Sequence, residues 1–387
     1  MTEPLRAEQV FRTMDSLAYV GGRPAGSAVI KQQFSDFRVD EDLGFEPSGR
    51  GEHLYLQLRK QNISTTELAR RLAESTGAGS RDVGYSGMKD RRGECSQWFS
   101  IRLAPEQETE LASLESDAVQ ILQTRRNHRK LRVGSHRANH FHLLLRDCHG
   151  DKNEFEQQLQ VIRERGVPNY FGPQRFGRRL SNLQQVRDLF AAGAKGTSKG
   201  RSRNGFGNND ALNKGERQQD KRKKRGMLYS AARAYLFNEV LSARLAAGNW
   251  ARYVPGDVLN LDGTNRNFSV AEEEWDETLQ HRLETFDIHL TGPLAGISNS
   301  QDKYLPGGAA ADIEKAVLDE YPQLVSGLQE HGLLAARRAL RFRVADLNWH
   351  WPAPDQLELR FVLPRGAYAT SLLREVCKIS EGEDHRI

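Results

Sequence analysis

One short segment of this sequence places a carboxylate among cations in a glycine-bounded turn. Residues 84–92 read GYSGMKDRR, and their single acid, Asp90, lies between Lys89 and Arg91. Neighbouring cations favour the charged form of a carboxyl group, and the same cations can bind a polyanion such as a nucleic acid. The segment therefore predicts acid–base or nucleophilic chemistry on a nucleic acid. The alternative is a surface turn in which Asp90 caps a backbone donor.

Positive charge is concentrated in two parts of the chain. Residues 195–225 hold eleven Lys and Arg against three acids, and residues 125–137 hold six cations and no acid. The net charge is only +5, so the rest of the chain is acidic. Two such clusters suit binding to a phosphate backbone, although each alone could be a solvated run of charge. Residues 193–226, rich in Gly, Ser, Asn, Lys and Arg, show no periodicity, and we expect a mobile basic loop there.

Length and composition limit the class of protein. A chain of 387 residues can form two domains with a sizeable core. Its three cysteines are far apart and show no zinc-site spacing, which indicates a reducing compartment and predicts no metal. No apolar run approaches the roughly 20 residues of a membrane span. We therefore expect a soluble cytoplasmic protein with no membrane partner.

Hydrophobic patterns place Asp90 between a helix and a strand. Residues 31–60 read as strands, in which Leu54, Leu56 and Leu58 alternate with polar or aromatic residues. A capping box at residues 64–67 predicts the start of a helix. Alternation resumes at Phe99 after the Asp90 turn. A loop between two such elements is a usual place for a catalytic group on a rigid scaffold.

The later part of the chain also alternates between strands and helices. Residues 139–145 and 357–363 have the period-two pattern of strands, and residues 153–165 and 230–248 have helical spacing. Residues 249–335 mix short strands with helices, and a final helix is expected through residue 376.

The Asp90 segment resembles the signature of the TruD family, the tRNA pseudouridine-13 synthases. In that family a G-x-K-D motif is followed by a glutamine, as residues 87–90 are followed here by Gln97. Six further blocks resemble the family's in the same order and cover about residues 31 to 378. They are Lys31 with residues 36–41 (DFRVDE), 47–53 (PSGRGEH), 60–65 (KQNIST), 139–141 (NHF), 166–177 (GVPNYFGPQRFG) and 361–370 (FVLPRGAYAT), with Ala367 where serine is usual.

This resemblance implies a reaction and a set of site residues. Uridine at position 13, in the D arm of tRNA, would be flipped out and isomerised to pseudouridine without a cofactor. Asp90 would be the catalytic residue, acting either as a nucleophile or by taking a proton from the sugar. The base-binding candidates are Phe37, Asn139 and Phe361, with Phe141 beside Asn139, and Lys31 is a candidate partner of Asp90 or of phosphate. The candidates for contact with the RNA backbone are Lys89, Arg91, Arg129, Lys130 and Arg175.

Ordinary structural roles compete with several of these assignments. Phe141 and Phe361 each lie in the apolar stripe of a predicted strand, where most such residues are only core. Asn139 is less easily explained in that way, because a buried amide needs hydrogen-bond partners. Lys89 could equally be a solvated loop charge.

We expect an α/β (α+β) protein of two domains. The resemblance implies a discontinuous catalytic domain, residues 1–160 and 338–387, with a mixed, largely antiparallel sheet. It also implies an inserted α/β domain specific to the family, residues 161–337. We expect tRNA as the partner, no protein partner, and a monomer. The rival hypotheses are a non-catalytic RNA-binding or RNA-chaperone protein and, less well supported, a nuclease or methyltransferase, because neither a metal-binding carboxylate cluster nor a glycine-rich cofactor loop occurs.

Overall fold

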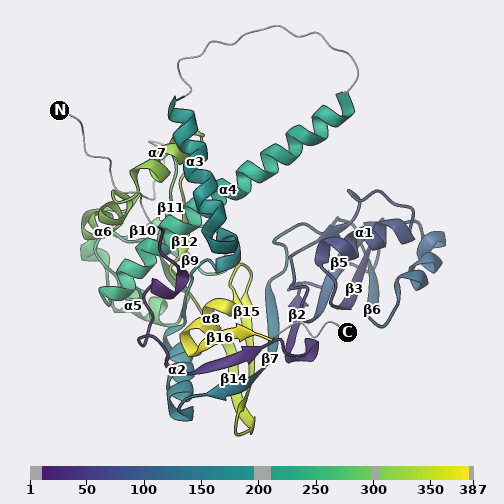
Figure 1. The fold of residues 1–387 in the computed structure, drawn as a ribbon, viewed down its shortest axis with the longest axis horizontal. Coiled ribbons are helices and arrows are strands. Elements are labelled where there is room, and N and C mark those ends of the chain that lie inside the picture. Colours follow the sequence, from purple (N-terminus) through teal and green to yellow (C-terminus); the bar gives the residue numbers. More distant parts are fainter. Residues whose placement is uncertain (1–10, 196–210, 299–304, 383–387) are drawn as a thin grey trace. The chain divides into compact units, whose positions relative to one another are not determined.

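The computed structural model describes residues 11–195, 211–298 and 305–382, which divide into two compact units (Figure 1). The Asp90 unit consists of residues 24–167 and 343–387. The second unit consists of residues 168–342 and the segment before residue 24. The chain passes from one unit to the other after residues 167 and 342, a few residues later than the expected positions 160 and 337.

The N-terminal segment differs from the expectation, because its described residues belong to the second unit. Phe11 packs edge-to-face on Tyr235 with 5.1 Å between ring centroids. The Arg12 guanidinium lies 3.1 Å from the Glu239 carboxylate. These contacts join residues more than 200 positions apart, so local sequence patterns could not reveal them.

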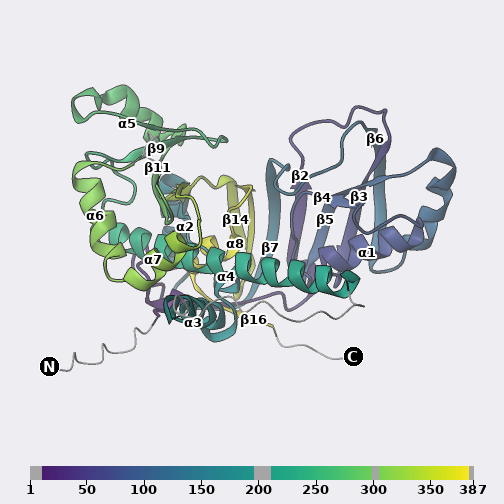
Figure 2. The same ribbon diagram turned by 90° about the horizontal axis from the view of Figure 1, so that it is seen from above.

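A ten-stranded mixed sheet forms the Asp90 unit. Its main path runs β14-β15-β7-β2-β5-β3-β6, and Figure 2 shows β2, β5, β3 and β6 side by side. The pairs β2·β5 and β1·β16 are parallel, whereas the other pairs described in this sheet are antiparallel. The predicted α/β class with a mixed, largely antiparallel sheet is confirmed. The strands are β1 (Ser27–Ile30), β2 (Phe37–Asp42), β3 (His53–Gln61), β4 (Gly84–Tyr85), β5 (Glu94–Arg102), β6 (Val119–Asn127), β7 (Ala138–His149), β14 (Ala345–Ala353), β15 (Gln356–Pro364) and β16 (Lys378–Glu381).

Helices α1 (Thr65–Ser75), α2 (Lys152–Arg165) and α8 (Ala369–Val376) complete the Asp90 unit. The predicted start of α1 is confirmed, because the Ser64 hydroxyl accepts a hydrogen bond from the backbone N–H of Glu67. The unit also holds the short 3₁₀ segments η2 (Phe34–Asp36) and η3 (Pro105–Leu114).

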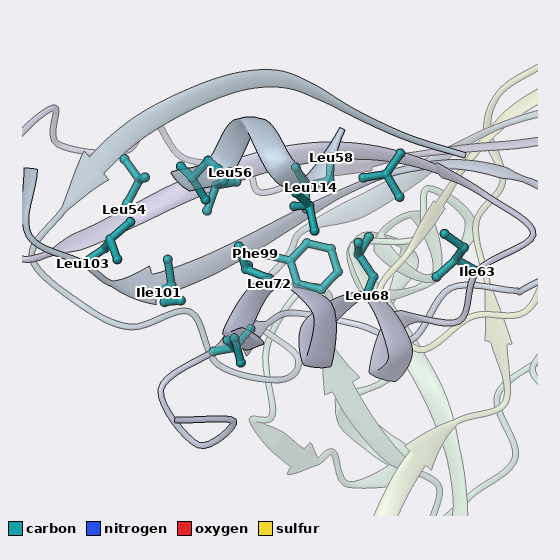
Figure 3. Packing of buried hydrophobic residues seen from close by; sticks show 14 residues of the cluster. Leu54, Leu56, Leu58, Ile63, Leu68, Leu72, Phe99, Ile101, Leu103 and Leu114 are labelled. Atoms are coloured by element: carbon teal, nitrogen blue, oxygen red, sulfur yellow. The ribbon is translucent and has the colours of Figure 1, made fainter. Parts of the chain in front are cut away.

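Helix α1 covers part of one face of the sheet and closes a hydrophobic core (Figure 3). Leu68 and Leu72 of α1 pack with alternating residues of β3 and β5, as the period-two pattern predicts. These alternating core residues are Leu54, Leu56, Leu58, Phe99 and Ile101.

The same face of the sheet continues from this core to the candidate site. Phe361 of β15 is paired with Phe141 of β7, and Phe141 is paired with Val39 of β2. Val39 is in turn paired with Cys95 of β5, which is paired with Lys60 of β3. Because paired residues point to the same face of a sheet, all five side chains share the face that α1 partly covers.

The second unit contains a four-stranded sheet and five helices among its described residues. The sheet order is β10-β9-β11-β12, and all neighbours are antiparallel. Its elements are η1 (Met14–Ser16), η4 (Pro173–Phe176), η5 (Arg178–Leu180), α3 (Ser181–Lys195), α4 (Ala211–Ala246), β9 (Val258–Leu261), β10 (Asn267–Ser269), η6 (Glu272–Glu274), α5 (Glu277–Glu284), β11 (Ile288–Leu294), α6 (Gly308–Leu318), α7 (Pro322–Glu330) and β12 (Ala336–Ala339), while β8 (Val167–Pro168) and β13 (Arg341–Phe342) lie at the boundaries of the units.

The expectation of a mobile basic loop at residues 193–226 is wrong for the part that the structure describes. Residues 193–195 end α3, and residues 211–226 form the first turns of α4, the long helix in Figures 1 and 2. Many of these residues are Lys, Arg, Gln and Glu, which are good helix formers. A helix can therefore form here without an apolar stripe. Residues 196–210 lie outside the described residues.

No helix within residues 11–195, 211–298 and 305–382 is long and apolar enough to cross a membrane.

The core beneath α1 should be sensitive to the loss of a single side chain. Leu68 is fully buried, whereas Leu122 on β6 is 39% exposed. Leu68→Ala should lower the free energy of unfolding by about 3 kcal/mol because it leaves a cavity. Leu122→Ala should cost less than about 1 kcal/mol. Urea denaturation measures both changes, and equal losses for the two variants would contradict this view of the core.

Candidate active site

Asp90 lies in an irregular loop, residues 86–93, between β4 and β5. The buried side chains of Thr65 and Gln97 form hydrogen bonds with the backbone of this loop. The Thr65 hydroxyl accepts a hydrogen bond from the Lys89 backbone N–H at 3.0 Å and donates one to the Gln97 side-chain carbonyl at 2.9 Å. The Gln97 amide nitrogen then donates to the carbonyl of Gly87. The loop therefore has a fixed shape, because buried polar partners determine its backbone path.

Glycine permits a close approach at the far end of this loop. A Cβ atom on Gly93 would lie 2.8 Å from the Phe37 carbonyl oxygen and 3.1 Å from its ring. A larger residue would force the loop away from β2, so Gly93 allows the Asp90 loop to lie against Phe37.

The Asp90 carboxylate faces a buried lysine. Its Oδ2 lies 3.5 Å from Nζ of Lys31, whose side chain is only 6% exposed, while that of Asp90 is 37% exposed. The Lys31 ammonium also lies 3.2 Å from the carboxylate of Glu381 in β16. The structure thus brings Lys31 to Asp90, and it adds Glu381, which the sequence did not suggest.

The three aromatic candidates form one cluster beside this ion pair. The Lys31 Nζ lies 4.6 Å from the centroid of the Phe37 ring. Phe37 contacts Phe141 edge-to-face at 6.2 Å, and Phe141 stacks on Phe361 at 5.1 Å with 15° between the ring planes. Phe37 and Phe361 are buried, whereas Phe141 is half-buried. Phe141 is thus the ring of the three with the most surface left for a ligand.

Asn139 is buried and has an unused hydrogen-bond acceptor. Its amide nitrogen lies 3.3 Å from Nε2 of His136, but its Oδ1 has no hydrogen-bond partner among the residues that the structure describes. Burial, and then the positive charge of Lys89, lowers the pKa of His136, and the opposing effect of Glu41 is smaller. A neutral His136 can accept from the amide nitrogen, which leaves Oδ1 to accept from a ligand donor.

Lys89 does not have the exposed position that contact with the RNA backbone requires. Its side chain is 6% exposed, and Nζ donates to the fully buried carboxylate of Glu41 at 2.6 Å. The other oxygen of Glu41 accepts from the Trp98 backbone N–H. Its charge is already paired in the interior, so we do not propose Lys89 as a phosphate ligand.

The other cationic candidates are differently placed. Arg91 is exposed, and its Nε donates to the Asn62 carbonyl at 3.2 Å. Arg129 is exposed, whereas the ammonium of Lys130 donates to the carbonyl of Arg81. Arg175 belongs to the second unit, where it donates to the Ser230 hydroxyl at 3.2 Å. Arg91 is thus the candidate cation adjacent to Asp90 with an exposed side chain.

A buried lysine that sequence reasoning did not select also touches the loop. Lys60 is fully buried, and its Nζ donates to the carbonyl of Asp90 at 2.7 Å and to that of Ile63 at 2.8 Å. The available signal was a lysine at an apolar position of an alternating strand, inside the KQNIST block.

Over the described ranges, no group of three potential metal-ligating side chains comes together.

The family model for tRNA pseudouridine synthase D (TruD) matches residues 13–193 and 216–376 of this chain. The chain belongs to the TruD family. A tRNA pseudouridine synthase D from Nitrosococcus oceani is 44% identical over 367 residues, which cover 94% of each protein. One from Ectopseudomonas mendocina is 41% identical and covers 92% of each. A crystal structure from Methanosarcina mazei, described as a putative tRNA pseudouridine synthase D, is 20% identical, with a TM-score of 0.64 over 95% of each chain, and so shares the fold.

The buried, neutral His136 predicts a pH-dependent contribution to stability. The pKa of His136 in the folded protein is lower than the ordinary value of 6.5, which applies to the unfolded chain. Between these two values the unfolded chain binds more protons, so the free energy of unfolding should fall as the pH drops below about 6.5. His136→Leu should show a shallower fall between pH 7.5 and 5.5 in chemical denaturation. Equal slopes for both proteins would contradict the lowered pKa.

Proposed function

We propose that this chain isomerises uridine 13 in the D arm of tRNA to pseudouridine, without a cofactor, and that Asp90 is its catalytic carboxylate. Membership of the TruD family makes the chain a tRNA pseudouridine synthase, an isomerase. The observation that carries the assignment to Asp90 is its partly exposed carboxylate, which lies beside the buried Lys31 ammonium and the aromatic cluster. The D-arm position rests on the resemblance of the sequence blocks.

The reaction rearranges bonds within one nucleotide. The bond between N1 of uracil and C1′ of ribose breaks, the base turns, and a bond forms between C5 and C1′. The C5 proton then leaves, and N1 gains a proton, so atoms and charge balance. Asp90 can act in either of two ways, by attack on C1′ as a nucleophile or by removal of the C2′ proton. In both, the Lys31 ammonium holds the carboxylate in place through an ion pair 3.5 Å long.

The residues around Asp90 supply a place for a flipped base. A base that leaves the stack needs an aromatic or apolar platform and polar contacts to its edge. The half-buried Phe141, stacked on Phe361, provides the platform. The Oδ1 of Asn139, which no described residue hydrogen-bonds, lies two positions before Phe141 on the same face of β7 and can accept from the N3–H of uracil.

Cations of both units are proposed to bind the tRNA backbone. In the Asp90 unit these are Arg91 next to the catalytic loop and Arg129 after β6, with Lys130 beside it. In the second unit the candidates are Arg175 and the basic first turns of α4. Recognition through backbone contacts and shape suits a folded RNA. We assign catalysis to the Asp90 unit and the family-specific RNA contacts to the second unit.

Replacement of Asp90 should separate turnover from binding. Asp90→Asn keeps the size of the side chain but removes its negative charge, so we expect kcat to fall by at least about 10³-fold. The affinity for tRNA should change by less than about threefold, because the backbone cations remain. Pseudouridine mapping on unmodified tRNA transcripts, with a filter-binding assay in parallel, measures both.

Wild-type protein should produce pseudouridine at one D-arm position, and a transcript with cytidine 13 should remain unmodified. Pseudouridine at another position only would contradict the D-arm assignment. Unchanged turnover by Asp90→Asn would contradict the role of Asp90. No pseudouridine on any tRNA, with binding intact, would favour the non-catalytic RNA-binding alternative.

A further inference from the structure

Lys60 lies where an apolar side chain would be expected. It is the last inward-facing residue of β3, after Leu54, Leu56 and Leu58 on the same face. Like Leu56 and Leu58, it is 0% exposed. The rest of this strand face is hydrophobic core, so the charge at position 60 requires an explanation other than packing.

The Lys60 ammonium has no acidic hydrogen-bond or ion-pair partner among the described residues. Both of its hydrogen bonds go to backbone carbonyls, those of Ile63 and Asp90. Its cross-strand neighbour Cys95 remains a thiol, because burial raises the pKa of that group to about 11. Burial also lowers the pKa of Lys60 itself.

Stability alone does not account for this residue. Removing an ammonium group from water is unfavourable, and two carbonyl hydrogen bonds offset only part of that cost. Methionine has a similar length and could occupy the same space without that cost. The hydrogen bond by which Lys60 fixes the Asp90 backbone therefore explains a lysine at this position better than stability does.

The segment that holds Lys60 fixes three consecutive residues of the catalytic loop. Thr65 holds the backbone N–H of Lys89, and Asn62 holds the side chain of Arg91. Lys60 provides the bond between them, to the carbonyl of Asp90 itself. This bond acts directly on the main chain of the proposed catalytic residue.

We propose that Lys60 is a positioning residue for the isomerisation, and that its ammonium sets the place of the Asp90 carboxylate by holding the Asp90 carbonyl. This inference rests on the proposed catalytic role of Asp90. Lys60 is fully buried and contacts the loop from inside the protein, so it has no surface to offer to tRNA. Its loss should therefore lower kcat and leave the binding of tRNA unchanged. A displacement of about 1 Å in a catalytic group can cost about 10²-fold in rate.

The first test replaces Lys60 by methionine. Lys60→Met should lower kcat by about 10²-fold, while the Kd for tRNA stays within about twofold because no phosphate contact is lost. The matched control is Lys152→Met, which removes one exposed lysine near Trp351 and should retain the wild-type kcat. A kcat within about threefold of wild type for Lys60→Met would overturn the proposal. A fall in kcat that is matched by an equal loss of tRNA affinity would do the same.

The second test restores the missing group from solution and does not depend on how Lys60→Met folds. In Lys60→Ala, n-propylammonium supplies the atoms that the substitution removes, including the donor. We expect it to raise kcat at least about tenfold, as the return of one charge-assisted hydrogen bond would allow. Tetramethylammonium at the same ionic strength has a charge but no N–H donor, and it should have no effect. Equal effects of the two cations, or none from either, would count against a positioning hydrogen bond.

Asp90→Asn, assayed in parallel, distinguishes the two possible failures. If Asp90→Asn turns over normally, the proposed function of Asp90 is wrong. If Asp90→Asn is inactive but Lys60→Met is fully active, only the positioning role of Lys60 is wrong.

Discussion

The loop that carries Asp90 depends on buried hydrogen bonds from a neighbouring segment, residues 60–65. Thr65 binds the backbone N–H of Lys89, and Lys60 binds the carbonyl of Asp90. Irregular backbone cannot satisfy its own polar groups as a helix or sheet does, so buried side chains must supply the partners. The segment that supplies them also begins α1, which closes the core of the Asp90 unit. The same segment therefore supports both that core and the loop that carries Asp90.

The two buried lysines of the candidate site have different ion-pair partners. Lys31 and Lys89 are both nearly buried, but Lys31 is shared by Asp90 and Glu381, whereas Lys89 is paired with the buried Glu41. The Asp90 carboxylate remains partly exposed, and this is the condition for contact with a substrate. Asn139 adds a buried acceptor that no described residue uses. In the proposed function, the N3–H of a flipped uracil would be the donor to this acceptor.

Local patterns predicted the parts of this structure that local forces determine. Alternation located β3 with its buried leucines and β5 with its buried Phe99 and Ile101, and the capping box located the start of α1. The same alternation placed Asp90 in a loop before a strand, but it did not reveal the short strand β4, which lies between α1 and this loop. The partners of Lys89 and Lys60 could not be predicted, because Glu41 and the Asp90 carbonyl are 48 and 30 residues away and meet them only in the folded sheet. The basic segment was misjudged because helix propensity, rather than apolar periodicity, determines the first turns of α4.

The Asp90 loop is expected to be fixed before tRNA binds, and the exchange rate of the Lys89 backbone amide reports on this. That N–H donates to the Thr65 hydroxyl inside the protein. In the free protein, this amide should therefore exchange its hydrogen at least about 10³-fold more slowly than in an unstructured chain. Its exchange rate should be similar to those of the amides in the α1 core. Exchange at the rate of an unstructured chain, with the α1 core still protected, would show instead that the loop is mobile without tRNA.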